Sequence, residues 1–466
     1  SDYATDTLNG GAGTDWFALH HNQGNAGSGL TYTINSGNSS NFENVGGTVG
    51  NDTLTGDGNA NKIFGGKGAD TITGGSGNDV LIGDIGSSNS LGLNGALKND
   101  HSSAAGNDTL YGGAGNDDLY GDAGDDTLDG GTGADTIETG SGADTIVLRV
   151  GDGGSTLATA DTIKDFTDGT DVLGMDDGLQ YTDLTIAQSG SDTVISVGSE
   201  YLAILTGISA SAVTAADFMS TSTSAQTFTG DSSNNTYIGG AGNDTFTGNA
   251  GSDVIYAHSG DDTININNKS GAYTDVVNGG SGTDSLVISY SGVSSMSDFA
   301  SIGYNSSTSI LTFTDSNGGT ISAKGMETFT IGSTVYSFVD DSGNHSTSGE
   351  SSNYMSHAFI RSDGDEIIFY TPSSGSTQLN INEGLRDFTG GATWLDAALS
   401  ITGSAASDNI TDGYGDTLNS LGSLTVNAGA GDDTVKITTL TEDTDTINLG
   451  SGDDTVHVGS DYATDT

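Results

Sequence analysis

Large apolar residues recur every nine positions over much of the chain, each flanked by small or polar residues. Residues 112–120 read GGAGNDDLY and residues 121–129 read GDAGDDTLD, so a six-residue polar part precedes a triplet with an apolar centre. In an extended strand, alternation sends that central side chain to one face and its two neighbours to the other. In the longest run the central position holds Leu110, Leu119, Leu128, Ile137 and Ile146. The pattern therefore predicts short strands that each bury one side chain.

The nine-residue period also predicts how these strands stack. If two nonapeptides form one turn of a coil, residues 18 positions apart in the chain lie at the strand spacing of about 4.8 Å. Thr109, Thr127 and Thr145 would then form one outward-facing ladder. Short fixed periods of this kind are typical of solenoids. We therefore predict an all-β fold, in which parallel β-roll blocks are interleaved with small antiparallel β modules.

The polar part of each repeat combines Gly with an Asp at its sixth position. Gly allows positive φ and close backbone approach, so loop carbonyls can turn toward an ion while the Asp carboxylate supplies charge. These are the oxygen ligands that Ca²⁺ prefers, and we expect several calcium ions in the chain. The candidate metal ligands are the sixth-position residues Asp15, Asp52, Asp70, Asp79, Asp108, Asp117, Asp126, Asp135, Asp144, Asp244, Asp253, Asp262, Asp284, Asp433 and Asp454.

Any one of these loops is also compatible with an Asx turn that binds no metal. In the unbroken run from Asp108 to Asp144, however, carboxylates without a cation would repel one another on successive turns. Calcium is the better interpretation there. It predicts that Asp126→Ala, in the middle of the run, raises the calcium midpoint of folding more than Asp15→Ala does.

Composition agrees with cation-dependent folding and excludes several classes of protein. The 466 residues include 62 Asp plus Glu against 10 Lys plus Arg, a formal charge of −52. Only eight of the acids are Glu and 54 are Asp, the acid of turns and of hard-cation sites. With 33% hydrophobic residues and few basic ones, neither membrane insertion nor nucleic-acid binding is expected. The chain has no Cys, so calcium would replace disulfides as the stabilising element.

The repeats resemble the GGxGxDxUx nonapeptide of RTX (repeats-in-toxin) proteins, where U is a large apolar residue. The resemblance implies a right-handed parallel β-roll with calcium between the loops of stacked turns. It implies that loop carbonyls and the sixth-position Asp residues named above are the ligands. It also implies export by a type I secretion system, and hence a place outside a Gram-negative cell or on its surface.

The repeats divide the sequence into five predicted segments. The first RTX block covers residues 1–147 with an insertion at 84–105, and a β-rich capping segment follows at 148–225. A second RTX block covers 226–287 and a third, RTX-like block covers 401–466. Between them, residues 288–400 are predicted to form an antiparallel module, because Asn317–Gly318 and Asp363–Gly364 are hairpin signals between strand-like runs.

The two ends of the chain carry the same seven residues. SDYATDT stands at residues 1–7 and again at 460–466. A cloning overlap would explain the identity without any biology. Joining the ends, however, continues the repeats in register, which favours a tandem array in which the partner of each unit is another copy of itself. A head-to-tail contact that does not close on itself makes a fibre.

Catalytic motifs of the proteins that often accompany such repeats are missing from this sequence. The seven His residues form no HExxH motif, and no Ser lies in a GxSxG nucleophile elbow. The Gly-rich loops are filled with Asp, so they would repel a phosphate. We therefore expect that this chain is not an enzyme.

Three other features have plainer interpretations than binding sites. The adjacent residues His20 and His21 point to opposite faces of a strand, so solvent exposure is favoured over a metal pair. Trp16 and Trp394 are interpreted as packing residues rather than a sugar site. The Thr ladders suggest ice binding, but Thr is a common exposed strand residue and the third triplet position varies.

The sequence thus predicts one unit of a calcium-stabilised extracellular structural protein, such as a surface-layer, sheath, filament or giant adhesin repeat. The chain would stay unfolded in the low-calcium cytosol and fold outside as it binds calcium. One alternative is the RTX part of a secreted enzyme or toxin whose catalytic domain lies elsewhere. Another is an adhesin that binds a cell-surface glycan through residues 288–400, which alanine at Trp394 or Tyr370 would test.

Overall fold

The computed structural model describes most of the chain in three continuous stretches, residues 42–84, 106–305 and 307–340. Shorter described pieces are 8–9, 12, 14–18, 29–35, 39–40, 357–361, 366–370, 378–380, 398–402, 409–411, 424–427, 433–437 and 446–458. The predictions for the duplicated ends, the 84–105 insertion beyond Asp84, the His20–His21 pair and Trp394 lie outside the described residues. The chain forms two compact units, residues 1–222 and 223–466.

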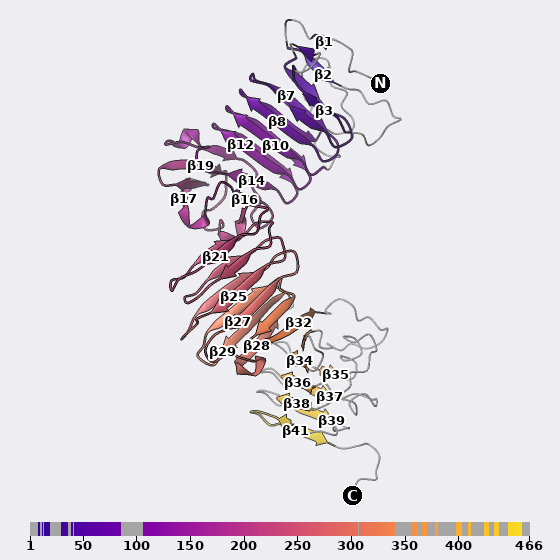
Figure 1. The fold of residues 1–466 in the computed structure, drawn as a ribbon, viewed down its shortest axis with the longest axis vertical. Coiled ribbons are helices and arrows are strands. Elements are labelled where there is room, and N and C mark those ends of the chain that lie inside the picture. Colours follow the sequence, from indigo (N-terminus) through magenta and orange to yellow (C-terminus); the bar gives the residue numbers. More distant parts are fainter. Residues whose placement is uncertain are drawn as a thin grey trace. The chain divides into compact units, whose positions relative to one another are not determined.

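The first unit is built on two sheets whose strands alternate along the chain (Figure 1). The eight-stranded sheet contains β3 (Thr31–Thr33), β6 (Thr53–Thr55), β8 (Thr71–Ser76), β10 (Thr109–Ala114), β12 (Thr127–Thr132), β14 (Thr145–Leu148), β16 (Val172–Met175) and β20 (Phe218–Ser220). The ten-stranded sheet contains β2 (Trp16–Ala18), β5 (Asn44–Gly46), β7 (Lys62–Gly66), β9 (Val80–Asp84), β11 (Asp118–Ala123), β13 (Thr136–Ser141), β15 (Asp161–Ile163), β19 (Glu200–Leu205), β18 (Asp192–Val197) and β17 (Leu184–Ser189). A small parallel pair, β1 (Leu8–Asn9) with β4 (Ser39–Ser40), lies near the start of the chain.

Register and core in this unit confirm the predicted coil of two nonapeptides per turn. Thr109 of β10 pairs with Thr127 of β12, which pairs with Thr145 of β14, all in parallel. The central residues of the triplets, Leu110, Leu119, Leu128, Ile137 and Ile146, are completely buried between the two sheets. Across the insertion, Thr71 of β8 still pairs with Thr109, so the additional residues leave the stack in register.

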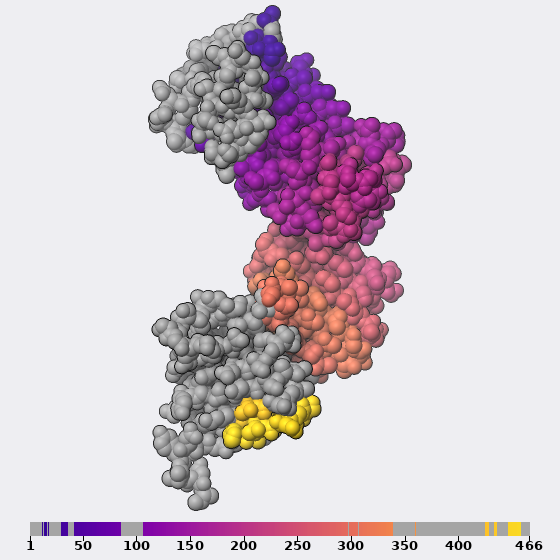
Figure 2. Space-filling view, turned by 180° about the vertical axis from the view of Figure 1, so that it is seen from behind, coloured from indigo at the N-terminus to yellow at the C-terminus, as the bar shows by residue number. Residues whose placement is uncertain are grey.

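The capping segment continues both sheets before it ends them. β15 and β16 pair in parallel with the last strands of the repeats, and β19 and β20 follow in parallel. The antiparallel strands β17 and β18 then close the ten-stranded sheet. Short 3-10 turns at Leu157–Thr159, Tyr181–Asp183 and Ala215–Asp217 join these strands. On the face shown in Figure 2, the cap residues (magenta) form one continuous surface with the roll (purple).

The second unit begins as a similar roll. Its eleven-stranded sheet contains β21 (Thr227–Thr229), β23 (Thr245–Thr247), β25 (Thr263–Asn267), β27 (Ser285–Ser289), β31 (Thr328–Ile331), β32 (Thr334–Asp340), β33 (His357–Arg361), β34 (Glu366–Tyr370), β36 (Ala398–Thr402), β38 (Leu424–Asn427) and β40 (Thr446–Asn448). A six-stranded sheet contains β22 (Thr236–Ile238), β24 (Val254–Tyr256), β26 (Thr274–Asn278), β30 (Thr320–Lys324), β29 (Ile310–Asp315) and β28 (Phe299–Asn305). A four-stranded sheet holds β35 (Gln378–Asn380), β37 (Asn409–Thr411), β39 (Thr434–Ile437) and β41 (Thr455–Val458).

The two predicted hairpins of this unit are present, but they share the sheets of the roll. β29 and β30 are antiparallel around Asn317–Gly318, where Gly318 has a φ of +82°. β33 and β34 are antiparallel on either side of Asp363–Gly364, which lies outside the described residues. β30 pairs in parallel with β26, and β31 with β27. The described strands β28–β34 and β36 therefore continue the two sheets of the second block, whereas β35 belongs to the four-stranded sheet.

The core of the second unit is richer in aromatic side chains than that of the first. Phe246, Phe313, Phe329 and Phe359 are completely buried. The ring centroids of Phe313 and Phe329 lie 5.7 Å apart, and those of Phe329 and Phe359 lie 5.2 Å apart in an edge-to-face contact. Such rings bury a large apolar area and add favourable pair geometry.

Candidate metal centres

The sixth-position Asp residues form hydrogen-bonded ladders along the roll. The backbone N–H of Asp108 donates to Oδ1 of Asp126 at 2.7 Å, and the N–H of Asp126 donates to Oδ1 of Asp144 at 2.8 Å. Each carboxylate thus lies against the backbone of the preceding turn. The same contact joins Asp52 to Asp70, Asp70 to Asp108, Asp79 to Asp117, Asp117 to Asp135, Asp244 to Asp262, Asp262 to Asp284 and Asp433 to Asp454.

The second oxygen of most of these carboxylates is buried without a hydrogen-bond partner. Asp126 shows the pattern, because its Oδ1 accepts from Asp108 while its Oδ2 contacts no donor. The same holds for Oδ2 of Asp15, Asp70, Asp79, Asp108, Asp117, Asp135, Asp144, Asp262 and Asp284. A buried anionic oxygen without a donor is costly unless a cation compensates it. These atoms therefore mark where positive charge is needed.

Backbone carbonyls converge on the same positions. A Cβ placed on Gly121, the first residue of its loop, would lie 2.6 Å from Oδ2 of Asp126 and 2.4 Å from the carbonyl oxygen of Thr139 on the next turn. Gly74 is arranged in the same way, with Oδ2 of Asp79 at 2.5 Å and the Gly112 carbonyl oxygen at 2.6 Å. Carboxylate and carbonyl oxygens from successive turns are a suitable donor set for calcium. The residues present therefore fit the ion that the repeat implies.

Carboxylates alone do not complete any of these sites. Within the described residues, no group of three or more His, Cys, Asp or Glu side chains is arranged to hold a metal ion. Calcium takes six to eight oxygen ligands, so loop carbonyls must supply much of the shell. When bound, a calcium ion would supply the positive charge that these buried carboxylates lack, held by the ladder Asp residues and the loop carbonyls.

Burial and mutual repulsion raise the pKa values of the ladder carboxyl groups. Burial, with the neighbouring Asp carboxylates, raises the pKa of Asp70 and Asp126 from 3.8 to about 8. The same causes raise the pKa of Asp262 to about 7, and burial raises the pKa of Asp108 and Asp144 to about 6. Without a cation, several of these groups would hold protons near neutral pH.

Three of the predicted ligands have a different environment. Oδ2 of Asp52 accepts the Thr48 N–H at 2.5 Å, and Oδ2 of Asp244 accepts the Gly240 N–H at 3.1 Å. Oδ2 of Asp253 accepts from the ammonium group of Lys269 at 2.7 Å. Donors within the chain already satisfy these three oxygens.

Near the end of the described chain, Asp433 is buried, whereas Asp454 is half-buried at the last strand of its sheet.

Sequence reasoning missed carboxylates that continue the ladder into the capping segment. The Asp135 N–H donates to Oδ1 of Asp161 at 2.9 Å, and the Asp144 N–H donates to Oδ1 of Asp171 at 3.2 Å. A signal was available, since residues 160–163 read ADTI, the same as residues 134–137.

The second block ends its ladders in a similar way. The Asp253 N–H donates to Oδ1 of Asp275 at 2.9 Å, and the Asp284 N–H donates to Oε2 of Glu327 at 2.7 Å. Neither acceptor was predicted from the sequence. Asp275 and Glu327 lie outside the nine-residue register, which explains why the period did not reveal them.

Arg149 balances charge where the regular repeats of the first unit end. Its guanidinium makes two hydrogen bonds to Asp129, at 2.6 and 2.9 Å, and also lies 3.2 Å from Asp152 and 3.1 Å from Asp176. The hydrogen bonds to Asp129 raise the pKa of Arg149, so its charge is permanent. A fixed side-chain cation therefore compensates carboxylates at the last turn of the first unit's repeats.

Stacked Gly-rich loops, parallel coil turns and ladders of buried carboxylates together define a calcium-binding β-roll. The chain matches the RTX calcium-binding nonapeptide repeat at residues 3–18, 46–87, 103–128, 120–153, 229–264 and 441–462. Over these segments the chain carries RTX calcium-binding nonapeptide repeats. RTX repeats bind calcium and occur in secreted proteins.

Two solved structures are similar to parts of the chain. The AlgE6R2 subunit of the Azotobacter vinelandii mannuronan C5-epimerase is 24% identical over 35% of this chain and 89% of that one, with a TM-score of 0.22. The extracellular lipase LipA from Serratia marcescens is 17% identical over 40% of this chain and 42% of the lipase, with a TM-score of 0.18. No curated protein gives a significant match. None of the helical segments among the described residues is long and apolar enough to cross a membrane.

Proposed function

We propose that this chain is one unit of a calcium-stabilised extracellular structural protein, of the surface-layer, sheath, filament or adhesin-repeat kind, and not an enzyme. The observation that carries the proposal is the repeated buried Oδ2 atom without a donor, found at turn after turn from Asp70 to Asp144. A ladder of this length serves to make a long, stiff body whose folding depends on calcium. Metal binding and folding are then one event.

This coupling suits a protein that leaves the cell through a type I secretion system. At cytosolic calcium levels the unneutralised carboxylates oppose folding, and the chain passes through the channel as a thread. Outside, calcium concentrations of about 10⁻⁴ to 10⁻³ M match the affinity of extracellular calcium modules. The roll then forms after export rather than before it.

Open sheet edges support head-to-tail assembly. Among the described strands, β40 and β41 are the last members of their sheets, and β2 and β3 are the terminal members at the N-terminal side of the first unit. Parallel edges of this kind present unpaired backbone groups to another chain. The heptapeptide shared by residues 1–7 and 460–466 would keep the repeat in register from one copy to the next.

Electron microscopy of the purified chain in millimolar calcium, and again after chelation, tests the proposal. Fibres or sheets with a regular spacing that disappear on chelation are the expected result. A matched sample that lacks residues 460–466 should assemble less, because the shared heptapeptide is removed. Dispersed particles in calcium, from protein shown to be folded by circular dichroism, would refute the assembly proposal.

A further inference from the structure

One position in the second unit's ladder already holds a cation that belongs to the chain itself. Between Asp253 and Asp275 one turn takes 22 residues, compared with 18 between Asp244 and Asp262. The longer turn includes the connection between β25 and β26, and Lys269 lies in this connection. The ladder contact survives the lengthening, since the Asp253 N–H still donates to Oδ1 of Asp275 at 2.9 Å.

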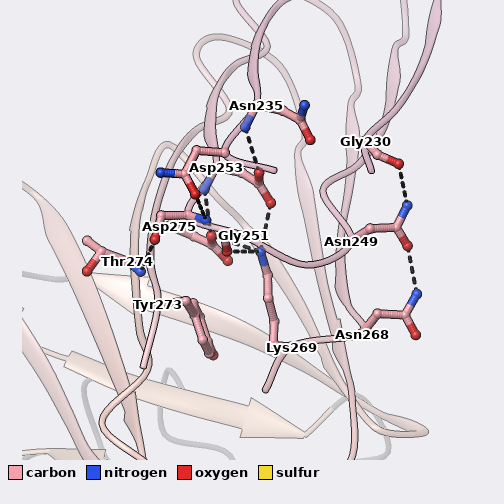
Figure 3. Close-up of polar contacts among 12 residues, drawn as sticks. Gly230, Asn235, Asn249, Gly251, Asp253, Asn268, Lys269, Tyr273, Thr274 and Asp275 are labelled. Carbon is pink, nitrogen blue, oxygen red and sulfur yellow. Dashed lines mark hydrogen bonds and ion pairs between the residues drawn. The ribbon is translucent and has the colours of Figure 1, made fainter. Parts of the chain in front are cut away.

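The Lys269 ammonium lies among three oxygens from successive turns (Figure 3). Its Nζ is 2.7 Å from Oδ2 of Asp253 and 2.9 Å from Oδ1 of Asp275. It also donates to the carbonyl oxygen of Gly251 at 3.0 Å. An ammonium group has three donors, so these three contacts use all of them.

Burial shows that this is an interior site and not a surface ion pair. The side chains of Lys269, Asp253 and Asp275 are each 0% exposed. Nζ also lies 5.2 Å from the ring centroid of Tyr273, a favourable cation–π distance. Lys is almost never fully buried unless it is paired, and here it is paired on two sides.

The segment that presents Lys269 is fixed to the neighbouring turns. Asn268 has a φ of +53°, and its Nδ2 donates to Oδ1 of Asn249 at 2.7 Å. Nδ2 of Asn249 in turn donates to the Gly230 carbonyl oxygen at 2.8 Å. The lysine therefore enters the ladder from a backbone that side-chain amides hold in place (Figure 3).

Comparison with a regular turn shows what the ammonium replaces. Oδ2 of Asp126 is buried with no donor, whereas the equivalent oxygen of Asp253 contacts Lys269. The contacts of Lys269, two carboxylates and one loop carbonyl, are of the same types that the calcium positions of the other turns offer. We propose that the Lys269 ammonium takes the place of a calcium ion between the turns of Asp253 and Asp275, so that this step of the roll forms without metal.

The second unit then has one pair of turns, those of Asp253 and Asp275, that stack without metal, and its calcium-dependent turns can stack on this pair. This arrangement concerns the folding of that unit and does not require head-to-tail assembly. Removing the ammonium by Lys269→Ala should open a position lined by Asp253, Asp275 and Gly251, which calcium can then occupy. Lys269→Met should fill the space without charge and leave the two carboxylates uncompensated.

Native mass spectrometry of the full chain in calcium measures the number of bound ions. We expect Lys269→Ala to bind one calcium more than the wild type and Lys269→Met to bind no additional one. Lys164→Ala is the matched control, because it removes a partly exposed lysine paired with Glu138 and should leave the count unchanged. A Lys269→Ala protein that folds without an additional ion would overturn the proposal.

Hydrogen exchange of the wild type keeps the proposal testable even if both variants fail to fold. As calcium is withdrawn, amides of residues 254–256 and 274–278 should stay protected at free calcium levels that already expose β12 and β14 of the first unit. Loss of protection at the same calcium level in both places would show that this step needs metal like the others. Lys269→Met should abolish the difference.

Discussion

At the scale of single residues, most regular nonapeptides present one buried carboxylate oxygen that has no donor. Oδ1 of each ladder Asp is fixed by a backbone N–H, which orients the side chain and leaves Oδ2 for a cation. Where the loop supplies its own donor, as Thr48 does for Asp52, the need for a cation is removed. The same residue type thus has two different roles at the same repeat position.

This difference predicts unequal effects of two identical substitutions. Asp126→Asn removes charge from an oxygen that has no donor, and should raise the calcium midpoint of folding by about tenfold, which corresponds to about 1.4 kcal/mol. Asp52→Asn is the matched control, and its effect should be much smaller because Thr48 already satisfies that carboxylate. Calcium titrations followed by far-UV circular dichroism measure both midpoints, and equal shifts would contradict the assignment.

The raised pKa values predict that acid can partly replace calcium. Asp70 and Asp126 have pKa values of about 8 in the folded chain, above the ordinary value of 3.8. Above pH 8 these charged groups destabilise the metal-free fold, and the penalty is removed as the pH falls from 8 toward 4. Metal-free protein should therefore gain β signal in circular dichroism over this range. A signal that falls or stays constant on acidification would argue against it.

The period alone was sufficient to predict the ladder residues of the regular turns. It could not reveal Asp161 and Asp171, because they follow their partners by 26 and 27 residues and so leave the 18-residue register. Nor could it reveal Lys269, since a single lysine in a loop has no pattern that indicates burial. Irregular spacing hides these residues from the period, although the ADTI sequence shared by residues 134–137 and 160–163 is a local signal for Asp161.

At the scale of elements, short strands are held in register by their loops as much as by their own residues. Positive φ at the second and fourth loop positions, as at Gly131 (+84°) and Gly133 (+150°), lets each loop nest on the previous one. Hydrophobic alternation predicted the strands and their parallel stacking correctly. It could not predict that the strands around Asn317 would join the roll, because Thr274 and Thr320, which pair across β26 and β30, lie far apart in the sequence.

Loop nesting predicts that a single methyl group can disrupt a turn. Gly131→Ala would place a Cβ 2.1 Å from the Gly113 carbonyl oxygen at a residue with positive φ, a conformation that costs about 1–2 kcal/mol for an L-residue even without the clash. The melting temperature in calcium should fall. Gly58→Ala is the control, since nothing lies within 4 Å of its Cβ position, and it should leave the melting temperature nearly unchanged. Similar losses in both variants would show that loop nesting is unimportant.

At the scale of the whole molecule, the two units balance buried charge in different ways. In residues 1–222 the described ladder runs through seven consecutive Asp with a donor-free oxygen, from Asp70 to Asp144. In residues 223–466 the ladder is shorter, Lys269 supplies one cation, and a continuous hydrophobic core includes Phe313 and Phe329. Apolar burial needs no metal, so the dependence on calcium should differ between the units.

Chelation should therefore unfold the chain in two steps. As free calcium falls, amides in β10, β12 and β14 should lose hydrogen-exchange protection before those in β29, β30 and β31, because the latter pack on Phe313 and Phe329. Phe329→Ala, which should cost about 3–5 kcal/mol, ought to bring the two steps closer together by weakening the second unit alone. Simultaneous loss of protection in the wild type would mean that calcium and the aromatic core stabilise a single cooperative structure. Loss in β29–β31 first would show that the hydrophobic core of the second unit depends on metal more than the ladder of the first.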